Sequence, residues 1–239
     1  MSNPWAGTCA AYKSVCQGFS THVEFPDIYV KHFDSIDLAN AGEHYEFAIE
    51  RYLKLGAKTE DQTLQEKKNA KLWTDDDENQ IKSLELNISL MQDKKSKASI
   101  ESQLDEIDII IKEYTDKLVP LLNKKYSLLL TSAEHLAEMA STDFILSVSL
   151  YRDKELSCPY FSLEDVEHFT ESETQRYVKL YRETVASLDH NMLRKTSINP
   201  RFFDFFKNAS SAESYFGKNG KHLTRNQITL FDCAKYFHM

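Results

Sequence analysis

The stretch WTDDDENQIKSLELNISLMQDKKSKASIESQLDEIDIIIKEYTDKLVPLL, residues 73–122, decides the fold of this 239-residue chain. Apolar residues recur in both halves of it at alternating intervals of three and four positions. Such spacing places them along one face of a helix and is typical of helices that pack lengthwise on a partner. The residues concerned are Ile81, Leu84, Ile88 and Met91 in the first half, and Ile100, Leu104, Ile107, Ile111, Tyr114, Leu118 and Leu121 in the second.

A polar run from Asp93 to Lys97 separates the two halves and predicts a short turn. Two long helices joined by a short turn favour an antiparallel, coiled-coil-like hairpin, which we expect over residues 74–140. Pro120 falls inside the second helix. Because proline lacks the backbone N–H and its ring clashes with the preceding turn, we expect a kink near residues 116–120.

The first helix of the hairpin has a strong start signal. Thr74 suits the N-cap position, and Asp77 stands three residues later, near the spacing of a capping box. The acidic residues from Asp75 to Glu78 complement the positive end of the helix dipole. They lie too close together at a helix start to converge as calcium ligands, so dipole complementation is the preferred interpretation.

Shorter helices are expected around the hairpin, which makes the fold class all-α. We divide the chain into an extended N-terminal arm over residues 1–26 and a helical domain over residues 27–239, whose C-terminal helical part begins at residue 141. The further helix signals are an amphipathic run over residues 37–55 followed by Gly56, capping-box spacing at Thr59 with Gln62 and at Ser162 with Asp165, an amphipathic run over residues 173–193, and a start at Thr224 with Gln227.

Composition excludes several classes of function. With 6 Gly and 5 Pro the chain is poor in turn residues, which argues against a β-sandwich and a glycine-rich phosphate site. A net charge of -8 without a basic block predicts no nucleic-acid partner. No apolar run approaches the roughly 20 residues that span a bilayer, so no membrane partner is expected either. Without a signal peptide, and with cysteines read as free thiols, the chain is expected in the cytoplasm.

The sequence offers no pattern that carries catalysis or metal binding. Its 4 cysteines form no C-x-x-C pair, and its 8 histidines form no H-E-x-x-H motif. Glu164 and His168 are one helical turn apart, which is more often a surface pair than a site. We therefore expect no catalytic residue, no cofactor and no metal, and we expect the protein not to be an enzyme.

Two groups of residues are candidates for contact with a partner. The lysines of the expected hairpin tip, Lys94, Lys95 and Lys97, would face outward. A phenylalanine cluster formed by Phe202, Phe203, Phe205 and Phe206 covers both faces of any helix it occupies. Such a cluster is either an exposed partner site or a plug in the core of the helical bundle.

Several short motifs resemble those of uncharacterised structural and assembly proteins of large tailed bacteriophages. They are Leu53 to Ala57, Leu72 to Glu78, the heptad hairpin, Leu130 to Glu134 and Leu223 to Gln227 with Phe231 and Phe237. The resemblance covers residues 50–239 and leaves out the N-terminal arm. It implies a virion structural or chaperone-like tail-assembly role, in the host cytoplasm or the virion, and carries over no catalytic residue.

Two hypotheses of function follow. The first is a non-enzymatic protein–protein interaction protein whose partner is a larger viral assembly or a second copy of the chain. The alternative is an enzyme or regulator with a site between the helical bundle and the phenylalanine-rich C-terminal segment. Histidines converging on acidic residues in a pocket would favour the alternative.

Overall fold

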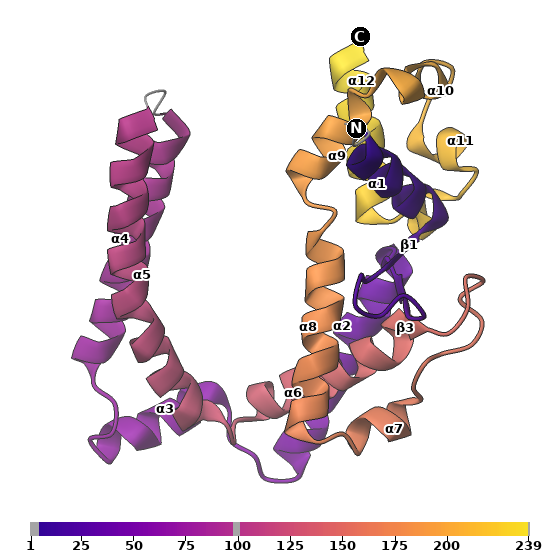
Figure 1. Cartoon of the computed structure of the whole chain (residues 1–239). Coiled ribbons are helices and arrows are strands. Elements are labelled where there is room, and N and C mark those ends of the chain that lie inside the picture. Colours follow the sequence, from indigo (N-terminus) through magenta and orange to yellow (C-terminus); the bar gives the residue numbers. More distant parts are fainter. Residues whose placement is uncertain (1–4, 98–100, 239) are drawn as a thin grey trace. The chain divides into compact units, whose positions relative to one another are not determined.

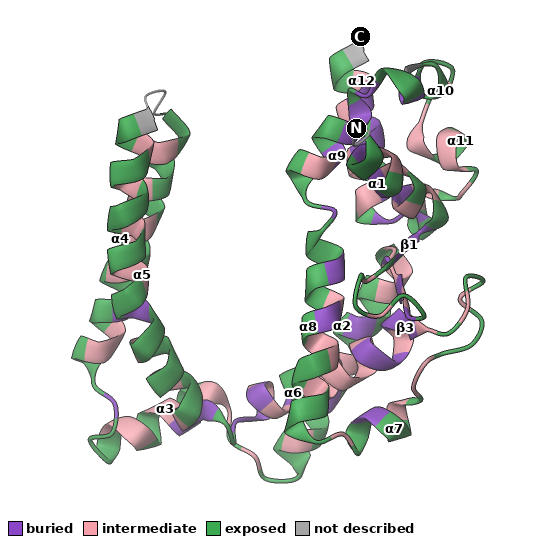
Figure 2. Ribbon diagram, in the orientation of Figure 1, coloured by how far each residue is buried: buried purple, intermediate pink, exposed green. Residues whose placement is uncertain are grey.

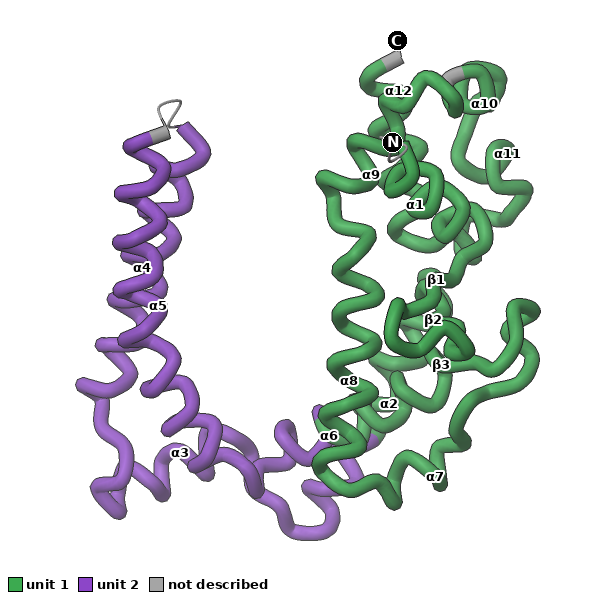
Figure 3. Tube along the Cα trace, viewed as in Figure 1, with its two compact units in different colours: residues 1–47, 139–239 green, residues 48–138 purple. Residues whose placement is uncertain are grey.

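The computed structural model describes residues 5–97 and 101–238, and it is predominantly helical (Figure 1). The predicted all-α class is confirmed. The chain divides into two compact units: residues 1–47 with 139–239 form unit 1, and residues 48–138 form unit 2 (Figure 3). This division differs from the expected one, because the expected helical domain over residues 27–239 is shared between both units.

Unit 2 contains the hairpin. Its helices are α3 (Glu60–Asn69), α4 (Asp75–Lys97) and α5 (Glu101–Leu129), and α4 and α5 lie side by side (Figure 1). Several apolar residues of the predicted heptad pattern pack together in the core of this unit. Ile81 and Leu118 are buried together with Trp73, and Leu84, Ile88, Leu121 and Leu128 pack against them. Ile100, which also belongs to the pattern, lies outside the described residues.

The ends of the hairpin differ from the expectation in two places. The segment expected as a turn, Asp93 to Lys97, is helical, because lysines are good helix formers and complement the negative end of the helix dipole. The second arm does not continue to residue 140, since α5 ends at Leu129 and α6 (Ala133–Ser149) begins after a break. Ser132 starts α6: its Oγ accepts a hydrogen bond of 3.2 Å from the backbone N–H of His135.

Pro120 lies inside α5, which continues through it. Proline cannot donate the backbone hydrogen bond at this position, so the helix loses one of its internal contacts there. Figure 1 shows the ribbon of α5 changing direction along its length. The helix therefore continues past the proline without ending there.

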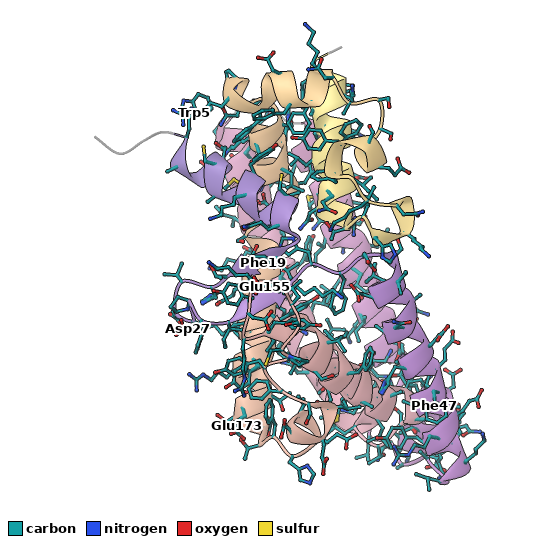
Figure 4. The ribbon with its side chains drawn as sticks, turned by 90° about the vertical axis from the view of Figure 1, so that its right-hand side faces the viewer. Trp5, Phe19, Asp27, Phe47, Glu155 and Glu173 are labelled. Atoms are coloured by element: carbon teal, nitrogen blue, oxygen red, sulfur yellow. The ribbon has the colours of Figure 1, made fainter. Side chains whose placement is uncertain are left out.

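Unit 1 begins with a helix where an extended arm was expected. Residues Ala6–Gln17 form α1, and Gly18 ends it in the left-handed conformation with φ 78°. The expectation of an arm over residues 1–26 is wrong for this segment. Ala11 and Val15 lie one turn apart on the buried face of α1, and the alanines around them favour a helix. Trp5 stands just before the first turn (Figure 4).

The first core of unit 1 joins α1 to the C-terminal part of the chain. α1 packs against α9 (His190–Ser197) and α12 (Arg225–His238). Between α9 and α12 come four short helical segments, η1 (Pro200–Phe202), α10 (Phe203–Lys207), α11 (Ala212–Phe216) and η2 (Gly220–His222). The buried residues of this core are Ala11, Val15, Leu188, Leu193, Phe202, Phe206, Leu230, Phe231 and Ala234.

A second core of unit 1 lies around a small antiparallel sheet that the sequence did not predict. Strand β2 (Tyr29–Lys31) lies between β1 (Phe19–Thr21) and β3 (Leu150–Tyr151), with Val30 opposite Ser20 and Leu150. Figure 4 marks Phe19 at the start of β1 and Asp27 in the loop before β2. Helices α7 (Leu163–Glu167) and α8 (Glu171–Ala186) contribute Val166 and Leu180 to this core, which also holds Ile28, Val30, Leu146 and Leu150.

Helix boundaries follow local hydrogen bonds. Capping boxes are present at Thr59 with Gln62 and at Ser162 with Asp165, as predicted. Helix α2 (Ser35–Lys54) is followed by Leu55 and then by Gly56. The backbone of Gly56 has φ 94°, a left-handed conformation that glycine adopts without strain. The single helix expected over residues 173–193 is two helices. The side chain of Asp189 accepts a 2.7 Å hydrogen bond from the N–H of Met192 and so starts α9 separately.

Candidate functional site

Both helices of the hairpin expose apolar side chains away from the contact between them. Leu86 and Leu90 on α4 are one turn apart, and 61% and 47% of their side chains are exposed. On α5, Ile109 is 60% exposed, and Val119, Leu122 and Tyr126 are exposed as well. Figure 2 shows how much of both ribbons is coloured as exposed. α5 therefore carries apolar residues on more than the one face that contacts α4.

The base of the hairpin is fixed by the acidic residues at the start of α4. Asp77 lies 3.2 Å from Lys124, Glu78 lies 2.9 Å from Lys125, and Asp75 pairs with Lys68 of α3 at 2.7 Å. The indole N–H of Trp73 donates to Glu78 at 2.9 Å. Burial acts to raise the pKa of Glu78, but hydrogen bonds from Lys125 and Trp73 bring it below its ordinary value. Besides complementing the helix dipole, these carboxylates thus hold α4 to α3 and α5.

The lysines predicted at the tip all lie in the last turns of α4. Lys94 and Lys97 are exposed. Lys95 is half-buried and forms an ion pair with Asp108 of α5. The structure therefore keeps Lys94 and Lys97 as candidate contacts, whereas Lys95 joins the two helices of the hairpin. Residues 98–100 of the expected tip lie outside the described residues.

The predicted phenylalanine cluster is divided between core and surface. Phe202 and Phe206 are buried, and the ring of Phe202 stacks on Tyr12 with a centroid distance of 3.9 Å. For these two residues the structure agrees with the alternative of a core plug and not with an exposed partner site, because they fill the core against α1. Phe205 is 58% exposed and remains a candidate contact. The side chain of Phe203 lies outside the described part of the structure.

An open groove of about 710 Å³ lies in unit 1 beside Phe205. α1 provides Tyr12 and Cys16 to its lining, and α11 provides Tyr215 and Phe216. Polar atoms come from Asn208, Ser210 and Ser214. No local sequence pattern indicates this groove, because its residues come from two segments that are far apart in the chain. We call it the aromatic groove.

A hydrogen-bonded pair of tyrosines, with Cys16 beside it, lines the aromatic groove. The hydroxyls of Tyr12 and Tyr215 form a hydrogen bond, and Tyr12 also interacts with the thiol of Cys16. Burial raises the pKa of Tyr12, of Tyr215 and of Cys16. All three groups therefore keep their hydrogens at neutral pH, and none is an activated nucleophile. The groove is a site for binding through neutral hydrogen bonds and aromatic contact.

His168, His190 and His222, the histidines considered for the alternative hypothesis, lie at three different elements of the described structure. Nδ1 of His168 lies 2.7 Å from the carbonyl oxygen of Glu164 in its own helix. His222 pairs with Asp34 at 3.3 Å, while His190 stands at the start of α9. Within residues 5–97 and 101–238 there is no group of three or more His, Cys, Asp or Glu side chains that could hold a metal ion.

Comparisons of the chain with protein-family models, curated proteins and solved structures each find no match. No helix in the described part of the chain is both long and apolar enough to cross a membrane. Two surfaces stand out on which a partner or a ligand can act. They are the exposed apolar residues of the hairpin in unit 2 and the aromatic groove in unit 1.

Proposed function

We propose that this chain is a non-enzymatic protein-interaction protein whose α4–α5 hairpin binds a helical segment of a partner protein. The exposure of apolar residues on a second face of α5 is the observation that carries this proposal. Ile109, Val119 and Tyr126 are exposed although Leu118 and Leu121 already pack with residues of α4. A helix that is apolar on more than one face is usually buried, and burial of each large aliphatic side chain is worth about 1.5–3 kcal/mol.

The dimensions of the hairpin suit a long helical partner. α4 has 23 residues and α5 has 29. At 1.5 Å per residue, α4 extends for roughly 35 Å, which gives a partner helix several turns of contact. Because the ion pairs of Asp77 with Lys124 and of Lys95 with Asp108 hold both ends of the pair, the exposed residues are presented on a preorganised surface.

The resemblance to structural and assembly proteins of tailed bacteriophages suggests the kind of partner that the hairpin would bind. Proteins of that kind act through contacts with larger assemblies. A chaperone-like or structural component would use an exposed apolar hairpin to hold a partner helix during assembly. The exposed Lys94 and Lys97 at the end of α4 would then add electrostatic steering toward an acidic partner.

A pair of matched variants tests the proposal. The double variant Leu86→Ser with Ile109→Ser removes exposed apolar side chains, and Glu85→Gln with Lys112→Gln changes exposed polar residues on the same helices. Tagged proteins are incubated with extracts of the native cells, including infected cells, and light scattering gives the mass of each purified chain. We expect the wild type and the polar variant to hold the same partner, and the apolar variant to lose it.

Circular dichroism and thermal unfolding check that both variants are folded. Substitutions at exposed positions usually change stability by about 0.5 kcal/mol or less, so both variants should keep the wild-type helical signal. The proposal fails if the apolar variant holds the partner as well as the wild type does. It also fails if the wild type is a monodisperse monomer that retains no partner.

A further inference from the structure

We propose that the aromatic groove is a binding site for a small uncharged molecule that carries a planar aromatic ring and a hydrogen-bond acceptor. The groove belongs to unit 1, whereas the proposed protein-binding surface belongs to unit 2. The two proposals therefore stand on different residues. Its volume of about 710 Å³ falls within the range of roughly 300–1,000 Å³ that is typical of small-molecule sites.

The walls of the groove favour an aromatic ligand. The ring of Phe205 is 58% exposed and lies nearly parallel to that of Tyr12, with a centroid distance of 6.4 Å and an interplanar angle of 22°. Phe216 meets Tyr215 edge to face at 4.7 Å. A planar ring that stacks on Phe205 would remove its exposed surface from water and gain aromatic contacts beyond simple burial.

The charge of the lining favours an uncharged ligand. The groove is lined by aromatic, hydroxyl, thiol, amide and alanine side chains, and no charged residue contributes to its described lining. A carboxylate, phosphate or ammonium group entering it would lose hydration without gaining an ion pair. Neutral ligands pay no such penalty.

The hydrogen-bonded pair of Tyr12 and Tyr215 supplies a donor for the ligand. Their hydrogen bond uses one of the two hydroxyl hydrogens, so the hydroxyl that accepts keeps its own. Both residues line the groove. Because burial raises the pKa of both hydroxyls, the remaining hydrogen is present at neutral pH for a carbonyl or similar acceptor.

Benzamide is a suitable probe, because it combines an aromatic ring with an uncharged carbonyl acceptor. Saturation-transfer NMR titration on the full chain measures its binding, and benzoate serves as the anionic molecule of the same shape. We expect benzamide to bind with a dissociation constant on the order of millimolar, as its size allows, and benzoate to bind at least fivefold more weakly.

Three variants locate the site. Phe205→Ala removes the exposed wall and Tyr215→Phe removes one hydroxyl of the tyrosine pair, so each should weaken benzamide binding roughly fivefold to tenfold. Tyr236→Phe is the matched control, because Tyr236 is 79% exposed and does not line the groove. This control should leave binding unchanged.

The inference is overturned if benzamide shows no saturable binding, if benzoate binds equally well, or if Phe205→Ala leaves binding unchanged. Phe205 is exposed, so its replacement tests the site even if Tyr215→Phe disturbs the fold. The hairpin variant Leu86→Ser with Ile109→Ser should bind benzamide like the wild type. Failure of the protein-interaction proposal and failure of this one are thereby distinguished.

Discussion

His32 and Asp143 each occupy surroundings that disfavour their charged forms. His32 is 6% exposed, its Nε2 lies 2.9 Å from Ser20 Oγ, and its Nδ1 is buried with no hydrogen-bond partner among the described residues. Burial, with a smaller contribution from the charge of Lys218, lowers the pKa of His32 to about 4. Burial, reinforced by Glu167, raises the pKa of Asp143 to about 6. The two shifts give stability opposite dependences on pH.

The His32→Gln variant should remove one pH dependence of stability. A lowered pKa means that the unfolded chain binds the proton more readily, so the contribution of His32 is complete above pH 6.5 and decreases as the pH falls toward 4. As the pH falls through this window, the free energy of unfolding of the wild type should decrease by about 3 kcal/mol relative to that of His32→Gln. Urea unfolding of both proteins at a series of pH values measures this difference, and a difference independent of pH would contradict it.

The Asp143→Asn variant should show the opposite sign. Because the folded state raises this pKa from 3.8 to about 6, the wild type loses stability as the pH rises through that window. Asp143→Asn should therefore gain about 1 kcal/mol over the wild type between pH 4 and pH 7, a value reduced for the partial solvent access of the group. In the same assay Glu167→Gln should give a smaller gain, since it removes only the secondary cause of the shift.

At the scale of single elements, helix α2 and the turn after it show how backbone conformation limits sequence. Gly42 lies within α2, where an added methyl group would meet no atom within 4 Å. Gly56 follows the end of the helix with φ 94°, and its N–H donates to the carbonyl of Leu53 at 3.0 Å. Replacement of glycine by alanine should therefore change the stability of the protein in opposite directions at the two positions.

Gly42→Ala should stabilise the protein by about 1 kcal/mol, because alanine loses less backbone entropy in a helix. Gly56→Ala should destabilise it by about 1–2 kcal/mol, because a Cβ is strained in the left-handed region. Thermal unfolding of each single variant beside the wild type measures both changes. Shifts of the same sign in the two variants would show that this account of the α2 terminus is wrong.

The elements that the sequence predicted are those whose signals are local. The heptad seam and the capping residues Thr59, Ser162 and Thr224 act within a few positions of the chain, and the structure places them as expected. Strand β3 has 2 residues, too few to show alternation, so the sheet escaped prediction. The aromatic groove escaped because Tyr12 and Tyr215 are 203 positions apart. The phenylalanine spacing did not show which rings are buried, since Phe205 and Phe206 both lie about one helical turn from Phe202.

At the scale of the whole molecule, the two units have separate hydrophobic cores. The core of unit 2 contains Trp73, Ile81 and Leu118, and the two cores of unit 1 are built from residues of unit 1 alone. The chain has 2 tryptophans, one in each unit. Trp73 is 1% exposed and Trp5 is 38% exposed, so they report on different surroundings.

The Trp5→Phe variant tests whether the two units unfold separately. Trp73 is then the remaining tryptophan, and its fluorescence follows unit 2, while far-ultraviolet circular dichroism follows the helices of both units. Because the cores share no residue, we expect the two probes to give different midpoints in urea. Coincident transitions would instead show that the units unfold as one cooperative structure.

The packing of α1 on α9 and α12 has a consequence for synthesis of the chain. Helix α1 is synthesised before α12 and cannot complete its core until α12 has been made, since Val15 and Leu230 belong to the same core. At about 5–20 residues per second, this interval lasts roughly 10–40 s. Residues 48–138 can close their own core earlier, so the nascent chain would carry a finished hairpin while the apolar face of α1 is still uncovered. Newly made molecules therefore pass through a stage in which α1 needs protection from aggregation.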